Sequence, residues 1–260
     1  MNTAHKVEEF LKNGYSVFND IIAEKDLKVL RLSLEKSSKE YDNLRKNSGV
    51  VNSSDGTLHH PILFSKDFLK FLDCDKMHVF LNKIFRGNYT LNTYGAVINR
   101  PNLETYVHSI HRDTRFFAGE YTLFTNVLFA VDDFTHENGA TAFLFGSQNS
   151  NLMPDEKTFN RDSDRLCLKA GEMCVFNSNI WHRAMINKSV MTRRAITMTF
   201  ARPWIKPQFD FTKSFSKERD KFSDNVRQSL GFNSRTPSTI EEWLLPASKR
   251  FYLGSQDDIY

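Results

Sequence analysis

From Tyr89 onward the chain carries short apolar segments separated by turn-forming residues. The segments lie at 90–98, 106–110, 122–131, 141–145, 172–176, 180–186 and 195–201. Each has the length of a β-strand, and several such strands at short intervals are typical of an all-β sandwich or barrel. We therefore predict a mainly β core over residues 89–207.

The region before the strands, residues 1–88, is predicted to be helical apart from one short strand at 15–18. Apolar residues recur there at helical spacing, and Gly14 offers a stop for a first helix. Acidic residues at 24–26 suit the start of a second helix, whose Leu27, Leu30 and Leu34 share one face. Residues 47–57 are predicted to form a loop, and 66–85 a further helix.

The tail, residues 208–260, contains a polar helix candidate at 216–230. A second helix is predicted to begin at the capping box Ser238-Thr-Ile-Glu241. No internal repeat, low-complexity tract or linker divides the sequence. We therefore expect one domain over residues 1–260, with peripheral helices before and after the β core.

Composition and charge exclude several classes of protein. The net charge of +4 is mild and lacks the concentrated basic face that nucleic-acid binding requires. The three cysteines form no Cys-x-x-Cys pair, which argues against a disulfide framework or a structural zinc site. The first residues lack the apolar core of a secretory signal, and the longest uncharged apolar-rich run, 121–131, is too short for a transmembrane helix. We expect a soluble, cytoplasmic protein that binds neither nucleic acid nor membrane.

The triplet His111-Arg-Asp113 is the first candidate metal-binding motif. On a strand, residues i and i+2 point to the same face, so both side chains can reach one point. The spacing is common by chance, and a surface strand with solvated side chains would also explain it.

His182 is the third candidate ligand, in a strand–turn–strand pattern over 171–184. Two imidazoles and one carboxylate on one face form the facial triad of non-haem Fe(II) oxygenases. That triad leaves coordination positions for a 2-oxo acid and O2. A histidine beside a tryptophan, as at Trp181, is also common as a packed aromatic residue without a ligand role.

Arg193 follows eleven residues after His182, with Asn187-Lys-Ser able to turn the chain between them. We therefore expect Arg193 on the antiparallel neighbour of the strand that carries His182. A guanidinium there could bind a carboxylate through two hydrogen bonds. Arg194 should point to the opposite face, so only one of the two arginines can serve.

Taken in order, these motifs resemble the phytanoyl-CoA dioxygenase family of Fe(II)- and 2-oxoglutarate-dependent oxygenases. The opening Phe10-Leu-Lys-Asn-Gly14-Tyr is similar to the family's helix-then-strand start. The other matching stretches are His111-Arg-Asp113; Ala130-Val-Asp-Asp133 leading to Glu137-Asn-Gly-Ala140; Phe145-Gly-Ser147; and Ala170-Gly-Glu through Trp181-His182-Arg-Ala to Asn187 and Arg193-Arg-Ala.

The resemblance implies a double-stranded β-helix, a cupin-like jelly-roll variant, with the metal at its open end. It further implies that His111, Asp113 and His182 bind Fe(II), and that Arg193 binds the distal carboxylate of 2-oxoglutarate. The expected reaction is hydroxylation of an unactivated carbon of a small molecule by O2, with release of succinate and CO2. By strand alternation Asn126 faces the barrel interior, where it could contact the cosubstrate or be a buried amide bonded to backbone.

Two positions depart from the family's usual pattern, since Ala184 stands where Ser or Thr often assists the arginine, and Gln148 replaces a histidine. Arg115, flanked by Phe116 and Phe117, is a candidate substrate contact that would suit an anionic substrate, although a surface arginine explains it as well.

Several alternatives remain at this point. Desaturation or ring closure would use the same residues, and a non-catalytic jelly-roll protein that binds a small molecule or sugar is the main alternative from another class. Halogenation is disfavoured because Asp113 occupies the position that a halide would need. A zinc hydrolase is disfavoured because no paired catalytic acid and base is evident.

Overall fold

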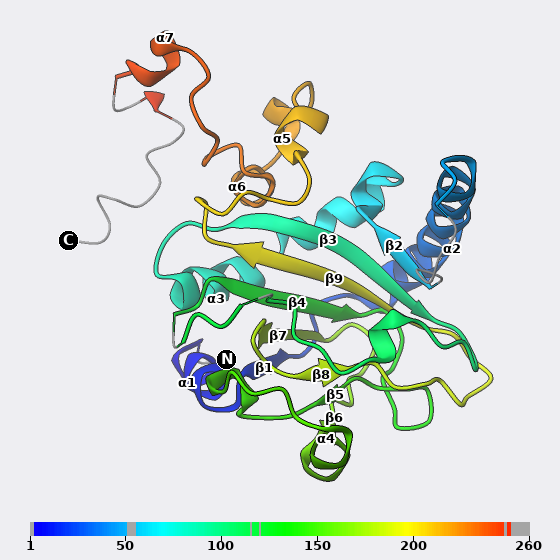
Figure 1. Ribbon diagram of the computed structural model, residues 1–260. Helices are drawn as coiled ribbons and strands as arrows, with labels where there is room; N and C mark the ends of the chain where they lie inside the picture. The colour runs from blue at the N-terminus through cyan, green and yellow to red at the C-terminus, as the bar shows by residue number, and fades with distance from the viewer. Residues whose placement is uncertain (1–2, 51–55, 115, 120, 247–248, 251–260) are drawn as a thin grey trace.

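A computed structural model describes residues 3–50, 56–114, 116–119, 121–246 and 249–250. Its core consists of two antiparallel β-sheets that face each other (Figure 1). The large sheet has the order β1 (Tyr15–Phe18), β7 (Met173–Asn177), β4 (Phe124–Ala130), β9 (Arg193–Ala201), β3 (Thr90–Asn99), β2 (Thr57–His59). The small sheet has the order β6 (Asp164–Arg165), β5 (Ala142–Phe143), β8 (His182–Arg183). This is the jelly-roll core with peripheral helices that was predicted.

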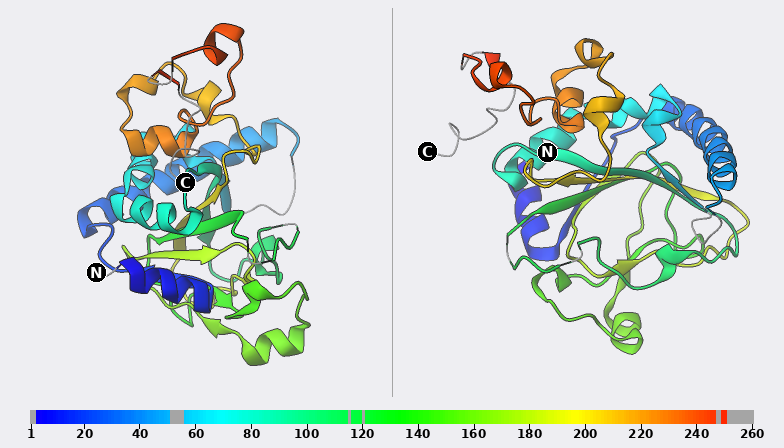
Figure 2. Two further views of the ribbon diagram at one scale, coloured as in Figure 1. Left: turned by 90° about the vertical axis from the view of Figure 1, so that its left-hand side faces the viewer. Right: turned by 45° about the horizontal axis from the view of Figure 1, so that its top comes forward.

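Helices cover the outer face of the large sheet (Figure 2). They are α1 (Thr3–Asn13), α2 (Glu24–Asn47), the 3-10 helix η2 (Lys66–Asp73), α3 (Asp75–Phe85) and α6 (Asp224–Leu230). A separate helix, α4 (Glu156–Asp162), lies beyond the small sheet (Figure 1). The remaining helices are η1 (Pro61–Leu63), η3 (Tyr106–His108), η4 (Ser147–Asn149), α5 (Phe211–Ser214), η5 (Arg219–Lys221) and α7 (Ile240–Trp243). None of the helices in the described ranges is long and apolar enough to cross a bilayer.

The alternation of side chains along β9 divides the core into two parts. Ile196, Met198 and Phe200 point outward and are buried beneath the helices. Ala195 points the other way, into a second apolar cluster between the two sheets that also holds Phe143 and Phe176. Burying a side chain of this size contributes about 1.5–3 kcal/mol, so both faces of the large sheet stabilise the fold.

Several predicted elements are confirmed. The strand at 15–18 is β1, and the strands predicted at 90–98, 122–131, 172–176 and 195–201 correspond to β3, β4, β7 and β9. The stop after the first helix is made at Gly14, whose φ of +85° is a left-handed conformation. A Cβ at Gly14 would also lie 2.6 Å from Gln148 Oε1, so a larger residue would displace the Gln148 side chain in addition to straining the backbone.

The segment at 106–110 was predicted as a strand, and this was wrong. It forms the 3-10 helix η3 with Thr105 as N-cap. The Thr105 side chain accepts from the His108 backbone, and the His108 ring bonds back to the Thr105 backbone N–H at 2.8 Å. These local bonds compete with strand pairing.

Two predicted helices are broken. The helix expected at 66–85 is divided at Cys74, whose backbone is extended, so that η2 and α3 pack their apolar faces separately. The helix expected at 216–230 is reduced to η5 and α6, because the Ser223 side chain accepts from the Val226 N–H and starts a new helix there. The loop expected at 47–57 falls partly on 51–55, outside the described residues.

The capping box of the last helix is displaced by one residue. Thr239, rather than Ser238, is the N-cap of α7, and its side chain accepts from the Glu242 N–H. The Glu242 carboxylate in turn accepts from the Ser238 backbone at 2.7 Å.

Candidate metal centre and cosubstrate pocket

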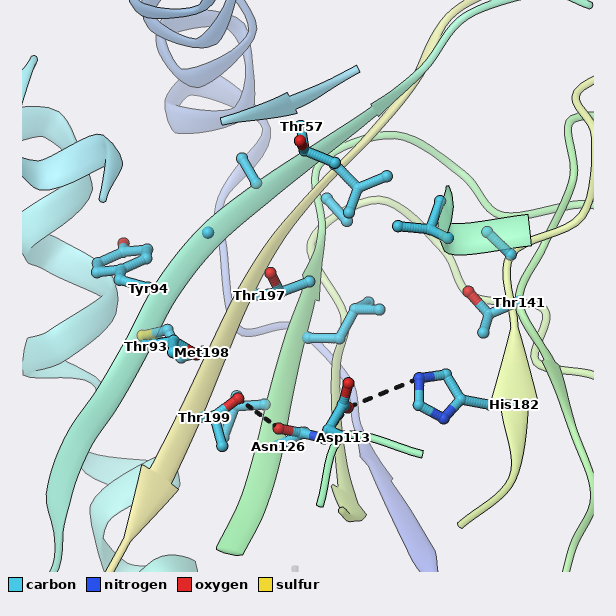
Figure 3. A pocket seen from close by; sticks show the side chains of 18 of the residues that line it. Thr57, Thr93, Tyr94, Asp113, Asn126, Thr141, His182, Thr197, Met198 and Thr199 are labelled. Atoms are coloured by element: carbon cyan, nitrogen blue, oxygen red, sulfur yellow. Dashed lines mark hydrogen bonds and ion pairs between the residues drawn. The ribbon is translucent and has the colours of Figure 1, made fainter. Parts of the chain in front are cut away.

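His111, Asp113 and His182 meet between the two sheets. One ligand atom from each lies within 4.8 Å of the others. His111 Nε2 is 3.8 Å from Asp113 Oδ1, and His182 Nε2 is 3.7 Å from Asp113 Oδ2. Figure 3 shows the Asp113 carboxylate directed at the His182 ring. The structure therefore brings together the three side chains that the sequence singled out, with the spacing that one metal ion requires.

The convergence does not come from a regular strand, as had been expected. His111 forms only an isolated bridge with His182, in which each backbone N–H donates to the other residue's carbonyl, at 3.0 and 2.8 Å. Asp113 lies in a bend, held where its N–H donates to the Ser178 carbonyl at 3.1 Å. Backbone hydrogen bonds therefore hold residues 111–113 against β8 and against the turn before it. These bonds, rather than the alternation of side chains along one strand, bring His111 and Asp113 to the same site.

Both imidazoles are oriented by the backbone. The Nδ1 of His111 lies 2.8 Å from the Ser109 carbonyl, and the Nδ1 of His182 lies 3.0 Å from the Ile180 carbonyl. A carbonyl only accepts, so Nδ1 carries the proton in each ring and Nε2 offers its lone pair to the site. Such bonds to the second ring nitrogen are usual for histidines that hold metals.

Burial supports the neutral form of His182. It lowers the pKa of this ring to about 4, against the opposing effect of the Asp113 carboxylate. Metal ligands must be deprotonated, and His182 meets that condition at neutral pH. His111 and Asp113 are more exposed, which leaves one side of the cluster open to the cavity.

Asn126, on β4, contacts the candidate ligand set directly. Its amide N–H donates to Asp113 Oδ2, and its carbonyl oxygen accepts from the Thr199 hydroxyl at 2.7 Å. Figure 3 shows this chain from Thr199 through Asn126 to Asp113. The partners are side chains rather than backbone, and Thr199 and Asn126 are opposed across the pair β4–β9. The amide holds the carboxylate in one orientation.

Arg193 is almost completely buried, with 1% of its surface exposed. Within the described part of the chain, its Nε and Nη2 have no hydrogen-bond partner, and its guanidinium lies 4.1 Å from the centre of the Phe134 ring. Burial lowers the pKa of Arg193 to about 10, so the group stays charged at neutral pH. A buried cation without a paired anion is costly, which indicates a site built for an anionic ligand.

The predicted placement of Arg193 beside the strand of His182 was wrong. β8 pairs with β5 in the small sheet, whereas β9 lies between β4 and β3 in the large one. The chain between His182 and Arg193 crosses from one sheet to the other, because β8 is only two residues long. The two side chains nevertheless line one cavity of about 430 Å³ between the sheets.

The remaining candidates lie as follows. Ala184 lines the cavity, and so does Thr141. The Thr141 hydroxyl, seen in Figure 3, could replace the hydroxyl of the Ser or Thr that the family often has at position 184. His59 also lines it, whereas the ring of His60 packs against Phe209. Arg115 lies outside the described residues.

Sequence reasoning overlooked part of the cavity wall. Thr93 and Gly95 of β3 and Thr197 and Thr199 of β9 line the cavity. The period-two alternation that placed Arg193 also places Thr197 and Thr199 on its face, so the signal was present in the sequence.

Two facing antiparallel sheets, with a candidate His-Asp-His metal site and a buried arginine in the space between them, define a jelly-roll protein with a candidate metal centre. The sequence model of the phytanoyl-CoA dioxygenase (PhyH) family matches residues 10–195, and the chain belongs to this family.

The chain is also similar to individual proteins and, in fold, to a solved structure. An uncharacterized protein of Mycobacterium tuberculosis, Rv1501, is 25% identical over 250 residues, covering 94% of this chain and 92% of the relative. Dioxygenase cdmA of Talaromyces verruculosus is 27% identical over 210 residues, covering 74% and 71%. The crystal structure of AviO1 from Streptomyces viridochromogenes has the same fold, with a TM-score of 0.58 at 18% identity, covering 79% of this chain and 97% of AviO1.

Proposed function

We propose that this protein is an Fe(II)- and 2-oxoglutarate-dependent dioxygenase that hydroxylates an unactivated carbon of a small molecule, with release of succinate and CO2. One observation carries the proposal. A buried guanidinium, whose Nε and Nη2 have no hydrogen-bond partner among the described residues, lines the same cavity as a His-Asp-His cluster. A dicarboxylic 2-oxo acid has the two ends that such a cavity would accommodate, a chelating end for the metal and a carboxylate for Arg193.

The three candidate ligands suit a catalytic iron better than a structural metal ion, whose coordination positions would all be filled by the protein. Two imidazoles and one carboxylate form the donor set of the facial triad, and that set leaves positions for other ligands. When bound, Fe(II) and 2-oxoglutarate supply the activation of O2. The histidine Nδ1–H bonds to backbone carbonyls keep both Nε2 atoms directed into the site. Asn126 keeps Asp113 oriented in the same way.

Arg193 gives the cosubstrate its orientation. Its planar guanidinium can bind a carboxylate through two parallel hydrogen bonds, and burial excludes the water that would weaken them. The pairing would also satisfy the donors that now lack partners. The Phe134 ring lies against the guanidinium, in a cation–π contact.

The test is whether 2-oxoglutarate turnover depends on the named residues. Fe(II) and 2-oxoglutarate are titrated together into the full chain without oxygen, and succinate is measured after O2 is admitted. We expect His111→Ala and His182→Ala to abolish metal-dependent succinate formation while circular dichroism remains native. His5→Ala, on the exposed surface of α1, is the matched control and should behave as wild type.

The outcomes separate the alternatives. A folded wild-type protein that binds neither Fe(II) nor 2-oxoglutarate would support a non-catalytic jelly-roll binding protein instead. Desaturation and ring closure employ the same residues, so mass analysis of the product, rather than succinate yield, distinguishes them from hydroxylation.

A further inference from the structure

One wall of the cavity is formed by three threonines and a glycine, all uncharged. We call Thr93, Gly95, Thr197 and Thr199 the threonine wall. They are cross-strand partners in two pairs, Thr93 with Thr199 and Gly95 with Thr197. Figure 3 shows Thr197 and Thr199 on the same side of β9, facing the space occupied by Asp113 and Asn126. All four residues line the cavity.

Two hydroxyls of this wall are available to a ligand. Thr199 is committed to Asn126, but Thr93 and Thr197 make no side-chain hydrogen bond to any described residue. Gly95 keeps the space in front of Thr197 open, because a Cβ at Gly95 would lie only 3.1 Å from Thr197 Oγ1. Hydroxyl groups that face a cavity select ligands that can donate or accept hydrogen bonds.

Other residues that line the cavity are also polar and uncharged. Tyr106 is hydrogen-bonded to the Thr57 side chain, and Gln208 also lines the cavity. Among the described lining residues, the metal ligands, Arg193 and His59 are the only members of the histidine, acidic and basic types. Burial lowers the pKa of His59 from its ordinary value of 6.5, which keeps this ring neutral at neutral pH.

We propose that the threonine wall binds the substrate of the reaction, and that this substrate is a neutral molecule bearing several hydroxyl groups, such as a polyol or glycoside. The proposal rests on the proposed function, which assigns the charged groups of the cavity to iron and 2-oxoglutarate. An anionic substrate would find its charge unpaired once Arg193 is occupied. A purely apolar chain would leave the threonine hydroxyls without partners, and such unpaired groups give strong discrimination.

This differs from the anionic substrate that Arg115 would suit, so the test compares charges directly. The probes are methyl glucoside and myo-inositol as neutral polyols, glucuronate as the matched acid, and octanoate as an apolar acid. Each is titrated calorimetrically into the full chain loaded with Fe(II) and 2-oxoglutarate without oxygen. We expect heat of binding with at least one neutral polyol, and none with glucuronate or octanoate at the same concentration.

Variants then locate the binding surface. Thr197→Val removes one hydroxyl at nearly constant volume and should weaken the neutral probe about threefold to tenfold. Gly95→Val fills the space in front of Thr197 and should weaken binding of the neutral probe further. Thr125→Val is the matched control, because Thr125 lies on the outer face of β4 and its hydroxyl has no partner among the described residues.

Separate readouts distinguish the two hypotheses. If 2-oxoglutarate binds but glucuronate or octanoate binds more tightly than every neutral polyol, or no polyol binds, the substrate proposal is wrong while the proposed function stands. The same holds if Thr197→Val and Thr125→Val bind the polyol equally. If 2-oxoglutarate itself does not bind, the proposed function is wrong. The threonine wall is then tested by the change in Tm that each probe causes in the absence of Fe(II) and 2-oxoglutarate.

Discussion

Arg193 and Arg194 leave β9 on opposite faces, and only Arg193 enters the cavity. Arg194 donates to Glu35 of α2 at 2.8 Å and to Asp132 at 2.9 Å. Arg194 is therefore no free surface cation, but links a peripheral helix to the large sheet. Among the described residues Arg193 has no such partner. Arg194 therefore stabilises the fold, whereas Arg193 remains available for the ligand-binding role proposed above.

We predict that Arg193→Ala weakens 2-oxoglutarate binding far more than Arg194→Ala. Losing one partner of a buried, hydrogen-bonded charge pair costs about 2–5 kcal/mol. Arg194 is outside the cavity, so its removal should leave the affinity within about twofold. Anaerobic titration of 2-oxoglutarate against the Fe(II)-loaded variants measures both effects. A larger loss in Arg194→Ala would mean that the assignment of the two faces is reversed.

The unpaired charge of Arg193 should also reduce the stability of the cosubstrate-free protein. Replacing even a paired set of buried charges by apolar residues of similar volume is often neutral or stabilises a protein by about 1–4 kcal/mol, and a charge without an ion-pair partner loses less on replacement. We therefore expect Arg193→Met to unfold at a higher temperature than wild type in the absence of ligands. At constant Fe(II), added 2-oxoglutarate should raise the Tm of wild type more than that of Arg193→Met. A lower Tm for Arg193→Met would show that the guanidinium stabilises the fold by itself.

We predict that Asn126 positions Asp113 for the metal. Removing such a partner of a metal ligand typically costs 10- to 100-fold in affinity, so Asn126→Leu should weaken Co(II) binding by about that factor. Thr199→Val, one bond further away, should have a smaller effect, and Thr125→Val none. Calorimetry with Co(II) and no cosubstrate gives the affinities. Wild-type metal affinity with weakened 2-oxoglutarate binding would instead support a direct contact of Asn126 with the cosubstrate.

His60 should make the protein less stable in mild acid. Burial, with a smaller effect from His59, lowers the pKa of His60 to about 4 from an ordinary 6.5. Between these values the unfolded chain binds the proton and the folded chain does not, so stability falls as pH falls. His60→Asn tolerates the left-handed backbone at this position (φ +53°) and removes the titration.

Urea unfolding at pH 7.5 and pH 5 tests this prediction. We expect His60→Asn to lose less free energy of unfolding between the two pH values than wild type does. Its stability at pH 7.5 should fall, because the ring packs 4.4 Å from the centre of Phe209. His5→Asn, on the surface, is the control. An equal loss in all three proteins would exclude His60 as a source of the acid sensitivity.

Local features of the chain were predictable because their causes are local. The helix beginning at 24–26 and its buried Leu27, Leu30 and Leu34 follow from spacing at helical period, which the structure confirms. β1 follows from a glycine stop and four extended residues. The same reasoning gave a wrong prediction for residues 106–110, because hydrogen bonds between Thr105 and His108 outweigh the strand propensity of that segment.

The ordered motifs indicated which residues belong to the site, although not how they meet. His111, Asp113, His182 and Arg193 do share one cavity, as the sequence led us to expect. The geometric reasons were different: an isolated bridge replaces the strand expected at His111, and the two sheets separate His182 from Arg193. Their joint presence in the cavity depends on strand pairs formed between distant parts of the chain.

The sequence by itself determined which side chains share a face, since alternation along a strand is a property of the local backbone. It therefore separated Arg193 from Arg194 without any knowledge of the fold. Only the tertiary structure decided which faces oppose each other, because sheet pairing joins residues far apart in the chain and depends on the whole core. That pairing sets Thr199 beside Asn126, and it buries Arg193 with no partner for its Nε and Nη2 among the described residues. It also brings the threonine wall and the metal cluster to one cavity.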